Sequence, residues 1–151
     1  MTISDMLSPA SVLVPLPAAD REAAITLLIE AIALPGSPEQ RGVLREAVLL
    51  REKAGSTGIG KGVAIPHART PLVSKPRLAA GRAVKPIDFS AADAQPVSLI
   101  FLLAVPESDP RSHLQALATL SRLASDAKLL KSLNRASTPQ EFLKLLSVLP
   151  L

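Results

Sequence analysis

The chain has 151 residues and a formal net charge of +4, with 48% apolar and 20% charged residues, a balance typical of one folded domain. It has no cysteine, which excludes disulfides, a thiolate nucleophile and cysteine-based metal sites. The longest apolar run, Leu99 to Val105, is too short to span a membrane, and the N-terminus lacks a secretory pattern. We therefore expect a cytoplasmic protein without membrane insertion.

The first part of the chain predicts a strand, two helices and a glycine-rich loop. Ser11–Val14 is a strand candidate, and Asp20 caps a helix that Pro35-Gly36 ends. Ser37-Pro38-Glu39-Gln40 starts a second helix with a capping box and a proline in the first turn. The predicted apolar face of this helix consists of Val43, Leu44, Ala47, Val48 and Leu50. The loop Gly55–Gly62 follows it.

The rest of the chain alternates between strands and helices. The predicted strands are 63–65, 78–84 and 97–105, and the last is apolar enough to be buried on both faces. Pro66 must end the first of them, because proline has no amide hydrogen to donate to a sheet. Helices are predicted from Asp109-Pro110, around Ala127–Leu133, and from Thr138 with a second capping box. The pattern predicts one α/β domain with helices packed on a small central sheet.

The positive charge is concentrated in the middle of the chain. Residues 41–85 hold ten Lys or Arg and two Glu, a net of +8, whereas the rest of the chain has a net of −4. Such a segment indicates an anionic partner or, equally, an ordinary solvated surface. Aromatic residues make up 2% of the chain, which leaves almost nothing to stack on bases, so we predict no nucleic-acid partner.

The glycine-rich loop is not a nucleotide-binding motif. Gly55 and Gly60-Lys61 have P-loop spacing, but Gly62 stands where a Ser or Thr must hold magnesium. The loop also follows a helix, whereas a P-loop follows a strand.

Two histidines are the candidates for chemistry. His67 directly follows a predicted strand and Pro66, and His113 lies in the first turn of the helix after the most buried strand. Anions bind at the carboxyl ends of strands and at helix N-termini, so both imidazoles could face one site if the two strand ends are adjacent. A zinc site would need a third ligand, and no short-spaced histidine pair offers a start, so we predict no metal.

A neutral imidazole can also attack phosphorus, a reaction that needs mainly alignment and nearby positive charge. One charge pair at about 4 Å is worth up to about 4 kcal/mol at an effective dielectric of 20. A single well-placed arginine therefore outweighs a diffuse basic patch. Arg51, before the glycine loop, and Arg69, just after His67, are the candidates.

The segment from Leu50 to Arg69 resembles the signature of enzyme IIA proteins of the fructose/mannitol type, from the bacterial phosphoenolpyruvate-dependent phosphotransferase system. The matching strings are Leu50-Arg51-Glu52-Lys53, Ser56 to Gly62, Val63-Ala64-Ile65-Pro66-His67-Ala68-Arg69, Pro86-Ile87-Asp88-Phe89, Val105-Pro106-Glu107 and His113-Leu114-Gln115-Ala116-Leu117. The histidine block ends in Ala68-Arg69, which is more similar to the nitrogen-regulatory branch of the family than to the sugar-transporting branch. The resemblance implies a single domain over residues 1–151, with a small mixed sheet flanked by helices on both faces.

The resemblance also implies roles for individual residues. His67 would accept a phosphoryl group on Nε2 from the phosphocarrier HPr or its nitrogen-branch counterpart. His113 would contact that group or orient His67, and Arg51 would offset its charge. The residues Thr57, Gly58, Gly60 and Arg69 would line the phosphoryl site. No cofactor is implied.

Simpler alternatives remain for each of these residues and for the function. Arg51 could pair with Glu46 or Glu52, Thr57 could be a turn residue, and His113 could be a polar residue without a phosphate contact.

The downstream partner could be a kinase, a channel or a transcriptional regulator. Alternatively, a sugar-specific protein would pass its phosphate to a IIB domain, and a pure binding module would use phosphorylation only marginally.

Overall fold

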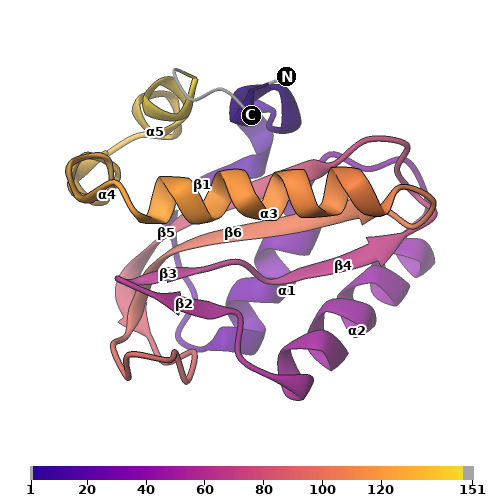
Figure 1. Ribbon diagram of the computed structural model, residues 1–151, viewed down its shortest axis with the longest axis horizontal. Helices are drawn as coiled ribbons and strands as arrows, with labels where there is room; N and C mark the ends of the chain where they lie inside the picture. Colours follow the sequence, from indigo (N-terminus) through magenta and orange to yellow (C-terminus); the bar gives the residue numbers. More distant parts are fainter. Residues whose placement is uncertain (1, 148–151) are drawn as a thin grey trace.

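A mixed sheet of six strands forms the centre of the computed structural model, which describes residues 2–147 (Figure 1). The strands are β1 (Val12–Leu16), β2 (Gly58–Gly60), β3 (Val63–Ala64), β4 (His67–Thr70), β5 (Arg77–Ile87) and β6 (Val97–Pro106). The α-helices of the described part are α1 (Arg21–Ala31), α2 (Pro38–Ala54), α3 (Pro110–Ala124), α4 (Ala127–Arg135) and α5 (Pro139–Leu146). Two 3₁₀ turns, η1 (Ile3–Met6) and η2 (Pro9–Ser11), precede β1.

The topology of the sheet sets β4 at its edge. The strand order is β1-β5-β6-β3-β2, and β4 pairs with β6 beyond the end of β3. Val63 of β3 pairs with Leu99, and His67 of β4 pairs with Leu103, so the two short strands follow one another along β6. Both run parallel to β6, whereas β5 runs antiparallel to it. The proline at position 66 thus separates two strands that share one partner.

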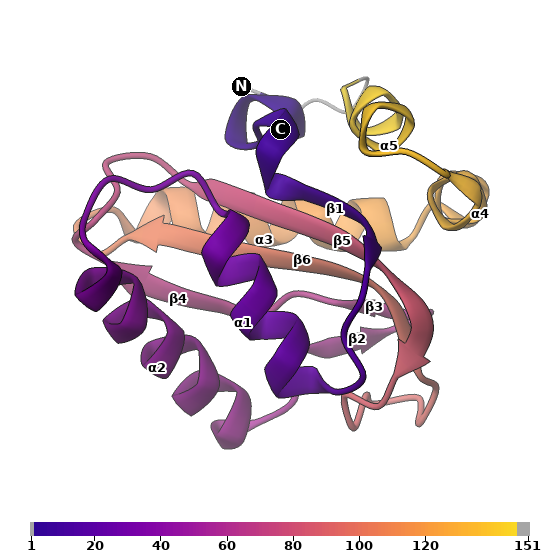
Figure 2. The same ribbon diagram turned by 180° about the vertical axis from the view of Figure 1, so that it is seen from behind.

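Strand β6 divides the core into two halves, as its apolar sequence predicts. Alternate residues pack into the half beneath α3, α4 and α5, and these include Leu99, Phe101, Leu103 and Val105. The intervening residues face α1 and α2, and these include Ile100, Leu102 and Ala104. Figures 1 and 2 show the two helical layers from opposite sides. Burial on both faces is confirmed, and it makes β6 the support of both cores.

The predicted helix starts agree with the structure. Asp20, Ser37 and Asp109 each accept a hydrogen bond from a backbone N–H in the first turn of the following helix. Ser37 also has the predicted capping box with Gln40. The box predicted at α5 is only half formed: Thr138 caps the Glu141 amide, but the Glu141 carboxylate accepts from the amide of Ser137.

Two predictions about local structure are wrong. The segment Gly55–Gly62 is not a continuous loop, because Gly58–Gly60 forms β2 and pairs with β3. The predicted apolar face of α2 is too wide, since Val43 is 71% and Leu50 is 70% exposed. Only Leu44 and Val48 of that set are buried, and the charged Glu52 continues their line one turn later.

Candidate active site

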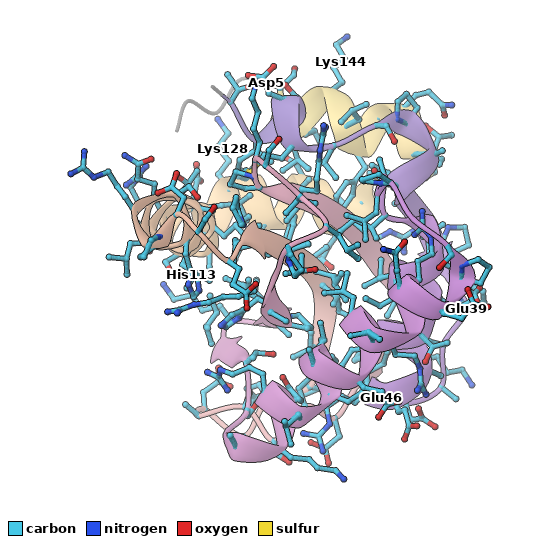
Figure 3. The ribbon with its side chains drawn as sticks, turned by 90° about the vertical axis from the view of Figure 1, so that its right-hand side faces the viewer. Asp5, Glu39, Glu46, His113, Lys128 and Lys144 are labelled. Atoms are coloured by element: carbon cyan, nitrogen blue, oxygen red, sulfur yellow. The ribbon has the colours of Figure 1, made fainter. Side chains whose placement is uncertain are left out.

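His67 and His113 lie against each other, with their ring centroids 5.4 Å apart and their planes inclined at 57°. Alternation along β4 explains this, because His67 and Arg69 pair with Leu103 and Val105, whose side chains face the α3 layer. His113 lies near the start of α3 (Figure 3), the helix that covers that face, and its ring therefore packs against that of His67. The structure brings together the two histidines that the sequence singled out. His67 follows β3 and Pro66 as expected, and it begins β4, a strand that the sequence analysis did not predict.

The backbone beside His67 fixes which ring nitrogen is free. Its Nδ1 lies 2.8 Å from the carbonyl oxygen of Ile65, two residues earlier. A carbonyl can only accept a hydrogen bond, so Nδ1 carries the hydrogen in the neutral ring. The lone pair of the neutral imidazole is then on Nε2.

Burial holds both histidines in the neutral form. Desolvation lowers the pKa of His67, and the positive charge of Arg51 lowers it further, while the bond to Ile65 and the charge of Glu52 oppose the shift. Desolvation also lowers the pKa of His113, with smaller contributions from His67 and Arg69. The Nε2 atom of His113 is buried and has no hydrogen-bond partner within residues 2–147. Such an atom is available to a group that enters the site.

Arg51 of α2 is the positively charged residue that acts on His67. It lies in the last turn of α2, where its Nη1 donates to the Gly55 carbonyl at 2.7 Å. Glu46, one of its two alternative partners, pairs instead with Arg45 at 2.8 Å. Glu52, the other, is directed inward to Thr57. The guanidinium is thus exposed at the site and held by the backbone of the glycine-rich segment.

Thr57 is not an ordinary turn residue. It is 4% exposed, and its hydroxyl donates to Glu52 Oε2 at 2.5 Å. Its backbone N–H lies 3.2 and 3.3 Å from the two carboxylate oxygens of Glu52. Sequence reasoning missed Glu52 as a site residue, although its spacing from Leu44 and Val48 places a charge on the buried side of α2.

The two glycines proposed to line the site have packing reasons of their own. A Cβ on Gly58 would lie 2.8 Å from the Cβ of Ala91, in the loop between β5 and β6. Gly60 has a φ of +98°, and a Cβ there would approach Asp93, whose carboxylate accepts from the Lys61 amide at 2.9 Å. The approach of this backbone to a phosphoryl group stays a prediction. Arg69 lies exposed on β4.

Part of the basic segment has a structural role. Arg41 donates to the carbonyls of Ile29, Ile32 and Leu34, which would otherwise be unpaired near the end of α1. Arg45 bridges Glu22 and Glu46. Arg82 donates to the carbonyl of Ala136. The charge excess of residues 41–85 is therefore not a single binding surface.

The described residues contain no cluster of three or more His, Asp or Glu side chains that could hold a metal ion. Over the same range, no helix is both long and apolar enough to cross a membrane. A surface cleft of 620 Å³ lies between α1 and α2, and its lining includes Arg21, Arg45 and Glu52 but neither histidine.

These features define a class of protein: an α/β domain that presents a neutral histidine, with its Nε2 lone pair free, beside a second histidine and an arginine. The family model described as "Phosphoenolpyruvate-dependent sugar phosphotransferase system, EIIA 2" matches residues 5–148. The chain belongs to this family.

Its relatives include both regulatory and sugar-specific proteins. It is 37% identical to a nitrogen regulatory protein of Bradyrhizobium diazoefficiens, over 99% of this chain and 97% of that one. It is 32% identical to the fructose-specific EIIABC component of Bacillus subtilis, over 97% of this chain but 23% of that larger protein. The crystal structure of the nitrogen regulatory protein IIA-Ntr from Neisseria meningitidis superposes with a TM-score of 0.80 at 31% identity, covering 95% of this chain and 98% of that one. The mixed sheet flanked by helices on both faces is the fold of this family.

Proposed function

We propose that this protein is a phosphohistidine carrier that accepts a phosphoryl group on Nε2 of His67 from an HPr-type phosphocarrier. The observation that carries the proposal is the Nδ1 contact with Ile65, because it leaves Nε2 as the free nucleophile of a neutral ring. Membership of the EIIA 2 family supports the same reaction. In this sense the protein is a phosphotransferase, with phosphorylated His67 as its covalent intermediate.

The transfer step exchanges one P–N bond for another. The His67 Nε2 lone pair forms a bond to phosphorus, while the P–N bond of the donor breaks and its electron pair returns to the donor imidazole. The hydrogen of His67 stays on Nδ1, which donates it to the Ile65 carbonyl oxygen, so the ring becomes an imidazolium as Nε2 shares its electrons. A later acceptor takes the phosphoryl group by the reverse exchange, which restores the neutral ring.

Neighbouring side chains would stabilise the charge of the phosphoryl group. Arg51 supplies positive charge that acts on His67, and Arg69 supplies positive charge that acts on His113. The unpartnered Nε2 of His113 is positioned to bind a phosphoryl oxygen when it carries a proton. Thr57 and the backbone at Gly58 and Gly60 would complete the site, once the Thr57 hydroxyl turns from Glu52 and donates to a phosphoryl oxygen.

The assignment can be tested with phosphoenolpyruvate, the general phosphotransferase enzyme and the phosphocarrier. The protein should acquire acid-labile phosphate, and the His67→Ala variant should acquire none. Because the chain has only two histidines, His113→Ala is the matched control, and it should still be labelled, although more slowly. Label that survives in His67→Ala would overturn the assignment.

We further propose that the phosphorylation state is read by regulatory partners in the cytoplasm, as the similarity to nitrogen regulatory proteins supports. A kinase, a channel or a transcriptional regulator would then bind the two states with different affinities. The similarity to a fructose-specific EIIABC component favours a second candidate, transfer to a IIB domain. Transfer of labelled phosphate from this protein to purified IIB domains would favour that candidate, whereas a partner whose affinity changes on phosphorylation would favour regulation.

A further inference from the structure

A chain of hydrogen bonds connects a buried carboxylate to the ring of His67. The amide and hydroxyl of Thr57 donate to Glu52. The carbonyl of the same threonine accepts from the Ile65 amide at 3.0 Å, and the Ile65 carbonyl faces Nδ1 of His67 at 2.8 Å. Every donor in the chain points toward Glu52. This series of hydrogen bonds runs from Glu52 at the end of α2, through Thr57 just before β2, to Ile65, the residue that precedes Pro66.

Glu52 is in an unusual place for a glutamate. It is 5% exposed, although it lies in the last turn of a surface helix. A buried carboxylate is costly unless hydrogen-bond donors and a positive charge surround it. Here Thr57 supplies two donors, and Arg21 of α1 lies 3.8 Å away on the other side. Fold stability alone would be served as well by an apolar residue continuing the line of Leu44 and Val48.

We propose that Glu52 is a positioning residue for phosphoryl transfer, which acts through Thr57 and Ile65 to hold the Nδ1–H form of His67. The inference rests on the proposed function and extends it to a residue that does not touch the reacting atoms. As Nε2 bonds to phosphorus, the ring gains positive charge, and the oriented carbonyl of Ile65 with the carboxylate behind it stabilises that charge. The same chain fixes the ring so that Nε2 faces outward.

The effect of Glu52 on the pKa of His67 can be told apart from that of its neighbour Arg51. The charges that act on His67 are those of Arg51 and Glu52, both from α2. The His113 ring packs against His67 from α3, and Arg69, two residues along β4, acts on His113. Arg51 lowers the pKa of His67, whereas Glu52 raises it. Loss of the Arg51 charge should therefore raise the pKa of His67, and loss of the Glu52 charge should lower it.

The test compares Glu52→Gln with Glu46→Gln, the same change six residues earlier on α2. Glu46 is exposed, pairs with Arg45 and lies well apart from His113 (Figure 3). Nitrogen-15 spectra of the histidine rings report the tautomer and pKa of His67 without any phosphorylation. For Glu52→Gln we expect a mixture of tautomers, a lower His67 pKa and phosphoryl transfer slowed about 10- to 100-fold, the usual cost of removing a partner that orients a reactive group. Glu46→Gln should match the wild type in all three.

The outcomes separate this inference from the proposed function. An unchanged tautomer, pKa and rate in Glu52→Gln, with normal labelling of the wild type, would overturn the role of Glu52 alone. Failure of the wild type to accept phosphate would overturn the proposed function, and the ring spectra would still decide whether Glu52 holds the tautomer. If Glu52→Gln does not fold, Glu52→Asp takes its place, because its shorter side chain draws the carboxylate away from the amide and the hydroxyl of Thr57. An unshifted His67 ring in that variant would contradict the proposal.

Discussion

At the scale of single residues, His67 combines a free Nε2 with a ring that stays neutral in slightly acidic solution. Its pKa is lowered from the ordinary value near 6.5, first by burial and then by Arg51. A protonated ring has no lone pair to attack phosphorus, so the transfer rate should fall only when the pH drops below the lowered pKa. We expect the acid limb of the pH–rate profile to lie below pH 6.5. A midpoint above that value would contradict this account of the burial of His67.

Replacing Arg51 by Gln should have two effects at once. The transfer rate should fall by about 10²- to 10³-fold, because one well-placed donor of positive charge is lost from the transition state. The acid limb should also move to higher pH, since Arg51 no longer disfavours the protonated ring. Lys53→Gln, an exposed charge two residues later on α2, is the control and should leave both quantities close to the wild type. A lower rate without a shift of the acid limb would indicate loss of local structure at Gly55 instead.

Sequence reasoning singled out the histidines and the arginine proposed to act in transfer, but not the residues that support them. His67, His113 and Arg51 were recognisable because their motif and their places after strands and helices are local features of the chain. The contact between Thr57 and Glu52 was not, since a glutamate near the end of a helix usually faces solvent. Only the packing of α2 against the sheet determines that Glu52 points inward.

At the scale of the elements, the glycines in α2 and β2 provide a matched pair of tests. Gly58→Ala should destabilise the protein by about 1–3 kcal/mol, because the new Cβ would collide with Ala91 in the loop between β5 and β6. Gly42→Ala should stabilise it by about 0.5–1 kcal/mol, since a Cβ at that position of α2 meets nothing within 4 Å. Urea unfolding of both variants measures the two values. Equal effects would show that the glycine-rich segment is not packed against the β5–β6 loop.

The longer elements and the short strand β3 were predictable from the sequence, whereas the short strands β2 and β4 were not. The caps of α1, α2 and α3 and the apolar run of β6 are strong local signals, and each corresponds to an observed element. Strands β2 and β4 have three and four residues and contain Gly, His and Arg, which have little preference for strands. They form because β2 can pair with β3 and β4 can pair with β6, and these partners are in place only in the assembled sheet.

At the scale of the whole molecule, the two histidines should make stability depend on pH. Both have pKa values below the ordinary 6.5 in the folded protein. The unfolded chain therefore binds more protons than the folded one as the pH falls through 6.5 toward the lowered values, and the free energy of unfolding decreases there. Asp5, Glu39 and Asp93 also have lowered pKa values, but their ordinary values near 4 place their contribution at more acidic pH.

Urea unfolding at pH 7.5 and 5.0 measures this dependence. The wild type should be less stable at pH 5.0, and a His67→Gln, His113→Gln double variant should lose much of the difference. The same decrease in both proteins would assign the pH dependence to other groups.

The central claim is that His67 carries the phosphoryl group on Nε2 while Nδ1 keeps its hydrogen bond to the Ile65 carbonyl oxygen. The most direct measurement is phosphorus-31 and nitrogen-15 spectroscopy of the phosphorylated protein, with its two histidines labelled. The account predicts phosphorus coupled to Nε2 of His67 and to no nitrogen of His113. Coupling to Nδ1 of His67, or to either nitrogen of His113, would contradict it.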